Sequence, residues 1–199
     1  MSNKHQEHIV CITSDKVAHR ANGYVDYTPK REDVMLGQRA VLEKDDRFRQ
    51  LLAIAVLVHE GKVWAYRRAP SSGESRLVGK VAIAVGGHFD AEDVIFNKSL
   101  VDIEKSIEIA LRRELDEEVD IQGNITNHTI HPKALCADDT PVDRLHMAII
   151  NFFEVDSPNV MSKETQLETI GFLSPEELLD NNDYELESWA KYICILLAE

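Results

Sequence analysis

An uninterrupted apolar run at residues 51–59 (LLAIAVLVH) constrains the fold of this 199-residue chain more than any other feature. The run is far shorter than the roughly 18 apolar residues that a membrane-spanning helix needs. The pair Glu60-Gly61 that follows is a turn signal, and residues 62–68 (KVWAYRR) come directly after it. The two segments therefore predict a β-hairpin whose first strand is buried.

The remaining segments mix strands and helices without a regular strand–helix–strand order. Strands are expected at residues 81–85, 129–136, 145–155 and 167–173, and helices at 99–119, from Pro175 onwards and at 184–197. Ser174 should cap the second helix, with Pro175 at its first position. This mixture predicts an α+β fold in which helices flank a mixed sheet.

The domain organisation is predicted to be simple. We find neither an internal repeat nor a Pro/Gly/Ser-rich linker in the sequence. Residues 1–199 are therefore expected to form a single domain. Residues 1–35 form an N-terminal extension whose structure the sequence leaves open.

Composition limits the partners that this chain can have. A net charge of −13 opposes binding to a nucleic acid polymer, although a small phosphorylated ligand can still bind where metal supplies positive charge. The N-terminal residues lack the apolar stretch of a secretory signal, so we expect a cytoplasmic protein with no membrane partner. The odd number of cysteines, all in apolar stretches, predicts buried, reduced thiols at Cys11, Cys136 and Cys194.

Within the helix predicted at residues 99–119, the segment 103–119 (IEKSIEIALRRELDEEV) carries carboxylates on its apolar face. At about 100° per residue, with Glu114 set at zero, Glu118 lies near 40° and Glu117 near 300°. The residues within roughly 60° of Glu114 are Ile103, Ile107, Ala110 and Leu111. The residues on the opposite side are Lys105, Arg112 and Asp116.

Carboxylates that face the protein body are costly without cations, and a group of three repels itself. Arg113 could pair with Glu117 at the i, i+4 spacing, which accounts for one charge at most. A hard divalent ion with oxygen ligands is the natural partner for the rest. The alternative is a helix end with solvated glutamates, but their place on the apolar face and the helix dipole both disfavour it.

The segment 113–121 (RELDEEVDI) resembles the second half of the Nudix box, whose pattern is G-x5-E-x7-R-E-U-x-E-E-x-G-U, where U is aliphatic. Gly86-Gly87 after a predicted buried strand resembles the glycine entry of that box. Residues 171–178 (GFLSPEEL) are similar to the strand-then-helix ending common in the family. The resemblance covers residues 51–179.

The resemblance implies an α/β/α sandwich that hydrolyses a phosphoanhydride bond in a nucleoside diphosphate derivative, with Mg²⁺ or Mn²⁺ as cofactor. It implies that the metal ligands, with catalytic roles, are Glu114, Glu117 and Glu118. By the same resemblance Arg113 helps to hold the helix, and a backbone carbonyl near Gly86 adds a ligand. A further acidic ligand is expected from a later loop, with Glu164 as the candidate and Glu168 in reserve. The resemblance also favours a homodimer.

The sequence departs from the box in three places. Twenty-five residues separate Gly87 from Arg113 where the pattern allows thirteen, so the loop carries an insertion of twelve. Lys105 stands where the first box glutamate is expected, with Glu104 one place away, and Asp120 replaces the terminal glycine. These departures motivate the alternative of a Nudix-fold ligand sensor or interaction module without turnover.

Two further residues are candidates for substrate binding. The guanidinium of Arg68 matches a phosphate group in a bidentate way, and a solvated loop is the equal alternative. His88, directly after the glycines, could contact substrate or a metal-bound water, and a structural histidine is the alternative. We assign structural roles to His131 and His146.

Overall fold

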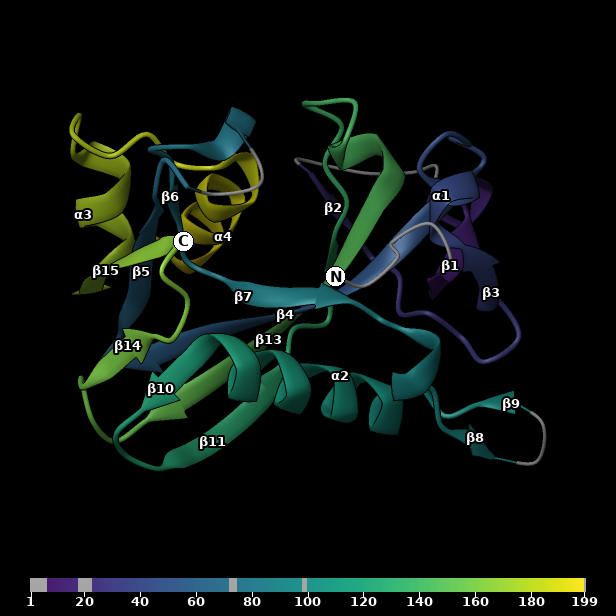
Figure 1. The fold of residues 1–199 in the computed structure, drawn as a ribbon, viewed down its shortest axis with the longest axis horizontal. Helices are drawn as coiled ribbons and strands as arrows, with labels where there is room; N and C mark the ends of the chain where they lie inside the picture. The colour runs from purple at the N-terminus through teal and green to yellow at the C-terminus, as the bar shows by residue number, and fades with distance from the viewer. Residues whose placement is uncertain (1–6, 18–22, 72–74, 98–99, 199) are drawn as a thin grey trace. The chain divides into compact units, whose positions relative to one another are not determined.

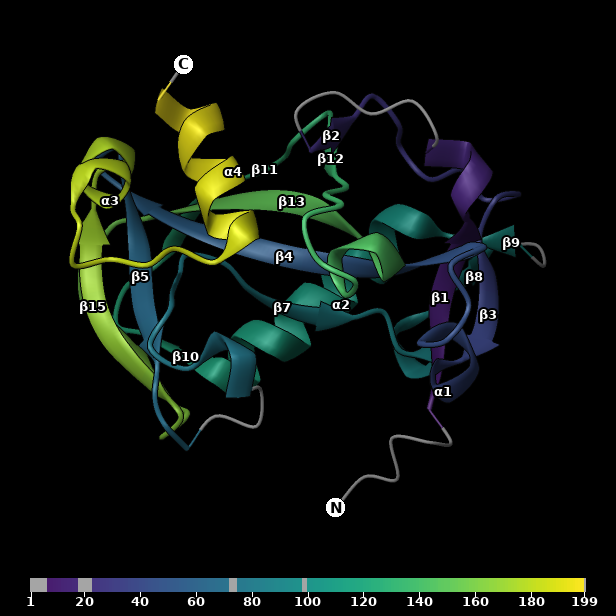
Figure 2. The same cartoon turned by 90° about the horizontal axis from the view of Figure 1, so that it is seen from above.

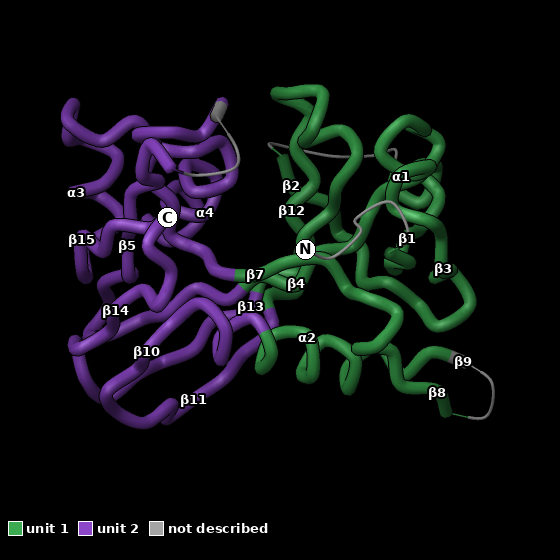
Figure 3. Tube along the Cα trace, viewed as in Figure 1, with its two compact units in different colours: residues 1–54, 86–113, 131–150 green, residues 55–85, 114–130, 151–199 purple. Residues whose placement is uncertain are grey.

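The computed structural model describes residues 7–17, 23–71, 75–97 and 100–198, and the chain forms two compact units (Figure 3). Unit 1 comprises residues 1–54, 86–113 and 131–150, and unit 2 comprises residues 55–85, 114–130 and 151–199. Four of the boundaries fall inside elements, namely strand β4 (Phe48–His59), strand β7 (Val85–His88), helix α2 (Ile103–Glu118) and strand β13 (His146–Val155). The single-domain organisation stays a prediction.

Unit 1 is built around the first half of β4 and the first residues of β13. Strand β1 (His8–Thr13) pairs antiparallel with β4 and with β3 (Met35–Gln38). Its central residues are fully buried, so part of the N-terminal extension belongs to the core of this unit. The other elements of unit 1 are 3-10 helices at Ser14–Val17, Ala91–Asp93 and Asp143–Leu145, helix α1 (Arg39–Leu42), and strands β2 (Tyr24–Val25), β7 (Val85–His88), β8 (Phe96–Asn97), β9 (Leu100–Val101) and β12 (Ala134–Leu135) (Figure 1).

Unit 2 has its own strands and the two C-terminal helices. Strand β5 (Lys62–Arg68) lies between the end of β4 and β15 (Leu167–Leu173), antiparallel to both. Figures 1 and 2 show α3 (Pro175–Asp180) beside β5 and β15, and α4 (Ser188–Ala198) packs on α3. The other elements of unit 2 are a 3-10 helix at Ser75–Leu77 and strands β6 (Val81–Ala82), β10 (Val119–Ile121), β11 (Ile125–Ile130) and β14 (Val160–Ser162).

The predicted hairpin and the C-terminal strand and helix are confirmed. Strand β5 begins and ends where the sequence places it, and the turn before it has Gly61 at a φ of 76°, a conformation that glycine adopts without strain. Strand β15 likewise matches residues 167–173. Ser174 caps α3 through a hydrogen bond from the Glu177 amide, with Pro175 at the first position. A mixed sheet with few helices confirms the predicted α+β class.

Two predicted strands and two helix starts were wrong. The C-terminal helix, predicted from residue 184, begins at Ser188. Residues 81–85 form two short strands because β6 pairs with β5 whereas β7 pairs with β4. Residues 129–136 are likewise split, with β11 ending at residue 130 and β12 beginning at 134. Helix α2 begins at Ile103, because residues 100–101 are extended as β9 and the Lys105 amide bonds to the Asp102 side chain. Ser99, which the sequence predicts as the N-cap of this helix because Asp102 follows three residues later, lies outside the described residues.

The three cysteines are free and buried, as the sequence predicts. Burial raises the pKa of Cys11 on β1 to about 11 and that of Cys194 on α4 to about 12. Both thiols are therefore protonated at neutral pH. None of the helices in the described part of the chain is long and apolar enough to cross a membrane.

Candidate metal centre

Helix α2 has the faces that the sequence predicts. Ile107, Ala110 and Leu111 are buried, whereas the residues expected on the opposite side, among them Arg112, are exposed. The predicted metal ligands follow the same division less strictly. Glu114 and Glu118 are half-buried, and Glu117 is exposed.

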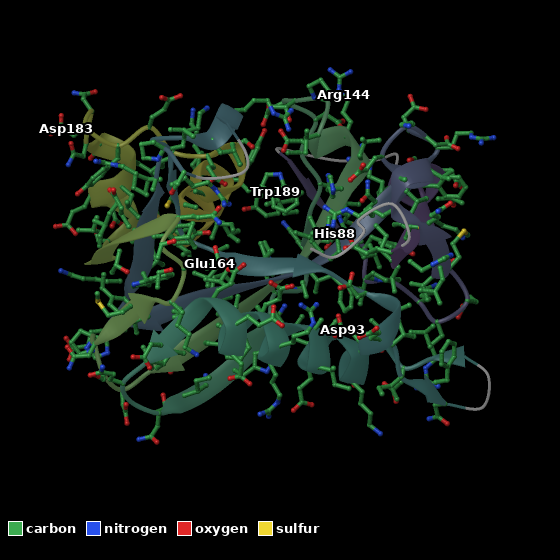
Figure 4. All side chains as sticks on the ribbon, viewed as in Figure 1. His88, Asp93, Arg144, Glu164, Asp183 and Trp189 are labelled. Atoms are coloured by element: carbon green, nitrogen blue, oxygen red, sulfur yellow. The ribbon has the colours of Figure 1, made fainter. Side chains whose placement is uncertain are left out.

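The segment after β14 fixes the C-terminal end of α2. The Lys163 amide donates to the Glu118 carbonyl oxygen at 2.8 Å, and the Lys163 ammonium donates to the Asp116 carbonyl oxygen at 2.7 Å. The Ser162 hydroxyl donates to the same Glu118 oxygen at 3.5 Å. A basic side chain on the last carbonyls satisfies groups that a helix end leaves without intrahelical partners. These bonds bring the neighbouring Glu164, labelled in Figure 4, to the last turn of α2.

The carboxylates at this helix end share one electrostatic environment. Burial, followed by the negative charges of Glu114 and Glu164, raises the pKa of Glu118 to about 8, and Glu117 adds a smaller contribution. The charge of Arg68 acts in the opposite direction. The other three predicted acidic ligands of unit 2 therefore all act on Glu118, which their distance in the sequence does not by itself require. Glu168, the reserve candidate, lies opposite Arg67 in the β15–β5 pair and is exposed.

Arg68 on β5 is held in place by a carboxylate that the sequence did not single out. Its Nε donates to Glu187 Oε1 at 2.6 Å, and its guanidinium lies 5.9 Å from the centre of the Tyr66 ring. Glu187 precedes α4, and its amide bonds to the Val81 carbonyl oxygen on β6. Only the packing of that segment on β6 could have revealed this partner.

The carboxylate donors suit a hard divalent cation, although their side chains do not form a complete coordination site. Within the described ranges, no three His, Cys, Asp or Glu side chains are arranged to hold a metal ion. The donors on the last turn of α2 are carboxylate oxygens, which Mg²⁺ and Mn²⁺ prefer. Their mutual repulsion, seen in the raised pKa of Glu118, is what a bound cation would relieve. The ligand roles of Glu114, Glu117, Glu118 and Glu164 stay predictions.

Arg113 makes its strongest contacts with the inserted loop, in unit 1. Its guanidinium forms a two-point ion pair with the buried Asp93, with Nε–Oδ1 and Nη2–Oδ2 distances of 3.1 and 2.8 Å. It also lies 3.8 Å from Asp90 and 3.5 Å from the His88 carbonyl oxygen. Asp93, labelled in Figure 4, lies in the enlarged loop of residues 88–102, so this loop supplies the anchor for this part of α2.

Gly86 occupies a place that only glycine fits. Its φ is 151°, and an added Cβ would collide with the Ala53 carbonyl oxygen and lie 2.9 Å from the Ile54 Cα. Both obstacles are backbone atoms of the neighbouring β4, so they cannot rotate away. The metal-ligand role of the Gly86 carbonyl stays a prediction.

His88 contacts a histidine to which the sequence gave a structural role. Its Nε2 lies 2.9 Å from Gln50 Oε1 and 3.3 Å from His146 Nε2. Burial lowers the pKa of His146, so this ring is neutral at pH 7. Substrate binding by His88 and by Arg68 stays a prediction.

Comparisons with known proteins show the fold. No protein-family model matches the chain. Protein YmaB of Bacillus subtilis is 25% identical over 163 residues, which cover 80% of this chain and 76% of that protein. The crystal structure of Tm1382, provisionally assigned to the Nudix hydrolases, is similar with a TM-score of 0.74 at 18% identity, over 96% of this chain and 98% of that one. The structure of DR0079 from Deinococcus radiodurans has a TM-score of 0.49 at 18% identity, over 88% and 99% of the two chains. The likeness to Tm1382 confirms the predicted Nudix-like fold.

Proposed function

We propose that this protein is a Nudix-type pyrophosphohydrolase that uses Mg²⁺ or Mn²⁺ to cleave a phosphoanhydride bond in a nucleoside diphosphate derivative or a related pyrophosphate. One observation carries the proposal. In a chain with a Nudix-like fold, the carboxylates of Glu114, Glu117 and Glu118 gather on the last turn of α2, where Lys163 and Ser162 bring Glu164 to them. The substrate is a small phosphorylated molecule in the cytoplasm, and neither a nucleic acid polymer nor a membrane is a partner.

The side chains of this group have separable tasks. Glu114, Glu117 and Glu118 hold the cation, and Glu164 supplies a further carboxylate. The bound cation would act as a Lewis acid toward the pyrophosphate and lower the pKa of the attacking water. Arg68, which Glu187 orients, offers a guanidinium to a phosphate group of the substrate. A carboxylate of the group takes the proton of the water as the bond to phosphorus forms.

The test is turnover of a substrate panel by metal-stripped protein that is resupplied with Mg²⁺ or Mn²⁺. The panel contains ADP-ribose, dinucleoside polyphosphates, NADH, nucleotide sugars and nucleoside triphosphates. We expect metal-dependent release of product, lowered on the order of 10³-fold in Glu117→Gln/Glu118→Gln because charge stabilisation at phosphorus is lost. Asp116→Asn is the matched control, because it removes one negative charge from the exposed face of the same helix turn. Equal turnover by all three proteins would refute the roles given to the glutamates.

A second candidate function is a ligand sensor without turnover. It is favoured by Lys105 at the place of the first box glutamate, together with the exposure of Glu104 in the first turn of α2. A sensor would be stabilised against heat by a member of the panel without consuming it. Thermal stabilisation with turnover would exclude this candidate.

A further inference from the structure

Unit 1 contains a second cluster of side chains with potential metal-ligand atoms, separate in its residues from the carboxylates at the end of α2. His88 ends β7 and His146 begins β13, and their Nε2 atoms lie 3.3 Å apart. Gln50 on β4 places its Oε1 at 2.9 Å from His88 Nε2. Three elements that are distant in the sequence therefore direct two imidazole nitrogens and one amide oxygen at the same point. Figure 4 labels His88 in this cluster.

The hydrogen bond on the far side of His146 determines which atoms carry lone pairs. His146 Nδ1 lies 2.7 Å from the Val142 carbonyl oxygen, which can only accept, so Nδ1 carries the hydrogen. The Nε2 atom of the neutral ring then presents its lone pair to His88. His88 Nε2 must carry the hydrogen that this lone pair and Gln50 Oε1 share. Two acceptors thus converge on one proton.

The geometry of the cluster matches a transition-metal ion in place of that proton. Two imidazole nitrogens bound at about 2.0–2.1 Å to a tetrahedral Zn²⁺ lie roughly 3.3 Å from each other. The bond from His146 Nδ1 to a backbone carbonyl is the support that metal-binding histidines generally have. The preferred class of ion follows from the donors, because imidazole suits zinc, nickel and copper whereas Mg²⁺ favours oxygen.

We propose that His88, His146 and Gln50 bind one divalent transition-metal ion such as Zn²⁺. The ligand atoms are the two Nε2 atoms and Gln50 Oε1, and solvent completes the coordination. The hydrogen on His88 Nε2 moves to Nδ1 of the same ring as the metal bond forms, so the ring stays neutral. This centre is separate in its residues and in its donor chemistry from the carboxylates at the end of α2.

The surroundings of Gln50 support a ligand role. Gln50 is fully buried, and its Nε2 has no hydrogen-bond partner among the described residues, which costs about 1–3 kcal/mol for a buried amide group. A metal ion bound at Gln50 Oε1 would give the amide a strong partner at its carbonyl oxygen, opposite Nε2. The neighbouring Arg49 helps to hold the backbone of His146 in place. It donates to the His146 carbonyl oxygen at 3.2 Å and forms an ion pair with Asp138 at 2.7 Å. Charges of both signs act on His146: Arg39 contributes a positive charge and Asp143 a negative charge.

Titration of the metal-stripped, full-length protein with Co²⁺, followed by its visible absorption, tests the proposal, with Zn²⁺ as competitor. We expect one equivalent of Co²⁺ with nitrogen ligation, displaced by Zn²⁺ and bound roughly 100-fold more weakly, or not at all, by His146→Gln. The matched control is His131→Gln, since His131 is in unit 1 and its Nδ1 lies 2.9 Å from the Lys133 carbonyl oxygen. Unchanged binding in His146→Gln overturns the proposal, and so does loss of that absorption in Glu117→Gln/Glu118→Gln.

A measurement on the unaltered protein covers the case in which His146→Gln fails to fold. The imidazole nitrogens are observed by NMR while Zn²⁺ is added. The Nε2 resonances of His88 and His146 should shift together at one equivalent, while those of His131 stay in place. Mg²⁺ at the same concentration should shift none of them. Resonances of His88 and His146 that Zn²⁺ leaves unchanged would overturn the proposal even without the variant.

Discussion

The ion pairs of unit 1 and the carboxylates at the end of α2 in unit 2 differ in how their charges are compensated. In unit 1 two arginines have fixed carboxylate partners, in the pairs of Arg113 with Asp93 and of Arg49 with Asp138. In unit 2 the half-buried Glu118 is surrounded by other carboxylates, and the charge of Arg68 only partly opposes them. Fixed partners stabilise the first arrangement without outside help. In the second arrangement the carboxylates repel one another, and a bound cation would relieve that repulsion.

The largest expected effect is on the close packing of β7 against β4 in unit 1. Gly86→Ala should destabilise the protein by at least about 3 kcal/mol, because the new Cβ meets two backbone atoms of β4. Gly61→Ala is the control, since its φ is also positive but no atom of the described residues lies within 4 Å of an added Cβ. It should cost only about 1–2 kcal/mol. Urea unfolding measures both, and equal losses would show that β7 is not tightly held.

The next effect tests the claim that unit 1 charges depend on fixed partners. Asp93→Asn leaves the Arg113 guanidinium without its buried carboxylate, and we expect a loss of about 3 kcal/mol in the free energy of unfolding. Glu108→Gln removes an ion pair with Arg112 on the exposed face of the same helix. That change should cost about 0.5 kcal/mol or less. A similar cost for the two variants would contradict the comparison.

In unit 2 the stability without metal should depend on pH through Glu118. Its pKa of about 8 lies above 4.5, the ordinary glutamate pKa that applies to the unfolded chain. The folded state therefore binds the proton more tightly than the unfolded state does. The contribution of Glu118 to stability is therefore fully present below about pH 4.5 and is lost as pH rises towards 8. Thermal unfolding in the presence of chelator should show this loss, and Glu118→Gln should remove part of it. The same slope in wild type and variant would exclude the repulsion at the helix end.

In unit 1 the corresponding slope has the opposite sign and is smaller. Burial lowers the pKa of His146 below its ordinary value of 6.5, so the unfolded state binds the proton more tightly. Its contribution to stability is present above pH 6.5 and is lost as pH falls through the folded pKa. His146→Gln should therefore lose less stability between pH 7 and pH 5 than the wild type does. A steeper loss in the variant would contradict the buried, neutral ring.

The sequence predicted best those features that depend on local pattern. The hairpin of β4 and β5 follows from an apolar run with a glycine turn, and the cap of α3 follows from Ser174 and Pro175. The carboxylates of α2 could also be found, because helical periodicity alone places Glu114 and Glu118 beside the buried Leu111. In each case neighbours in the sequence are neighbours in space.

The features that the sequence did not predict depend on long-range pairing. Residues 81–85 have the composition of one strand, yet their two halves find different partners in β5 and β4. Glu187 could not be connected with Arg68 from spacing, since 119 positions separate them. His146 was assigned a structural role because nothing in its local sequence points to His88. Pairing across a sheet brings such residues together, and no local pattern records it.

The buried thiols can be used to measure local opening of the structure. Cys11 lies in unit 1 and Cys194 in unit 2, and the raised pKa of each keeps the unreactive protonated form. An alkylating reagent can therefore modify either cysteine only when the surrounding structure opens and exposes it. The rate of modification at Cys11 measures how often β1 separates from its neighbours, and the rate at Cys194 measures the same for α4. Ions that bind one unit should slow labelling there first.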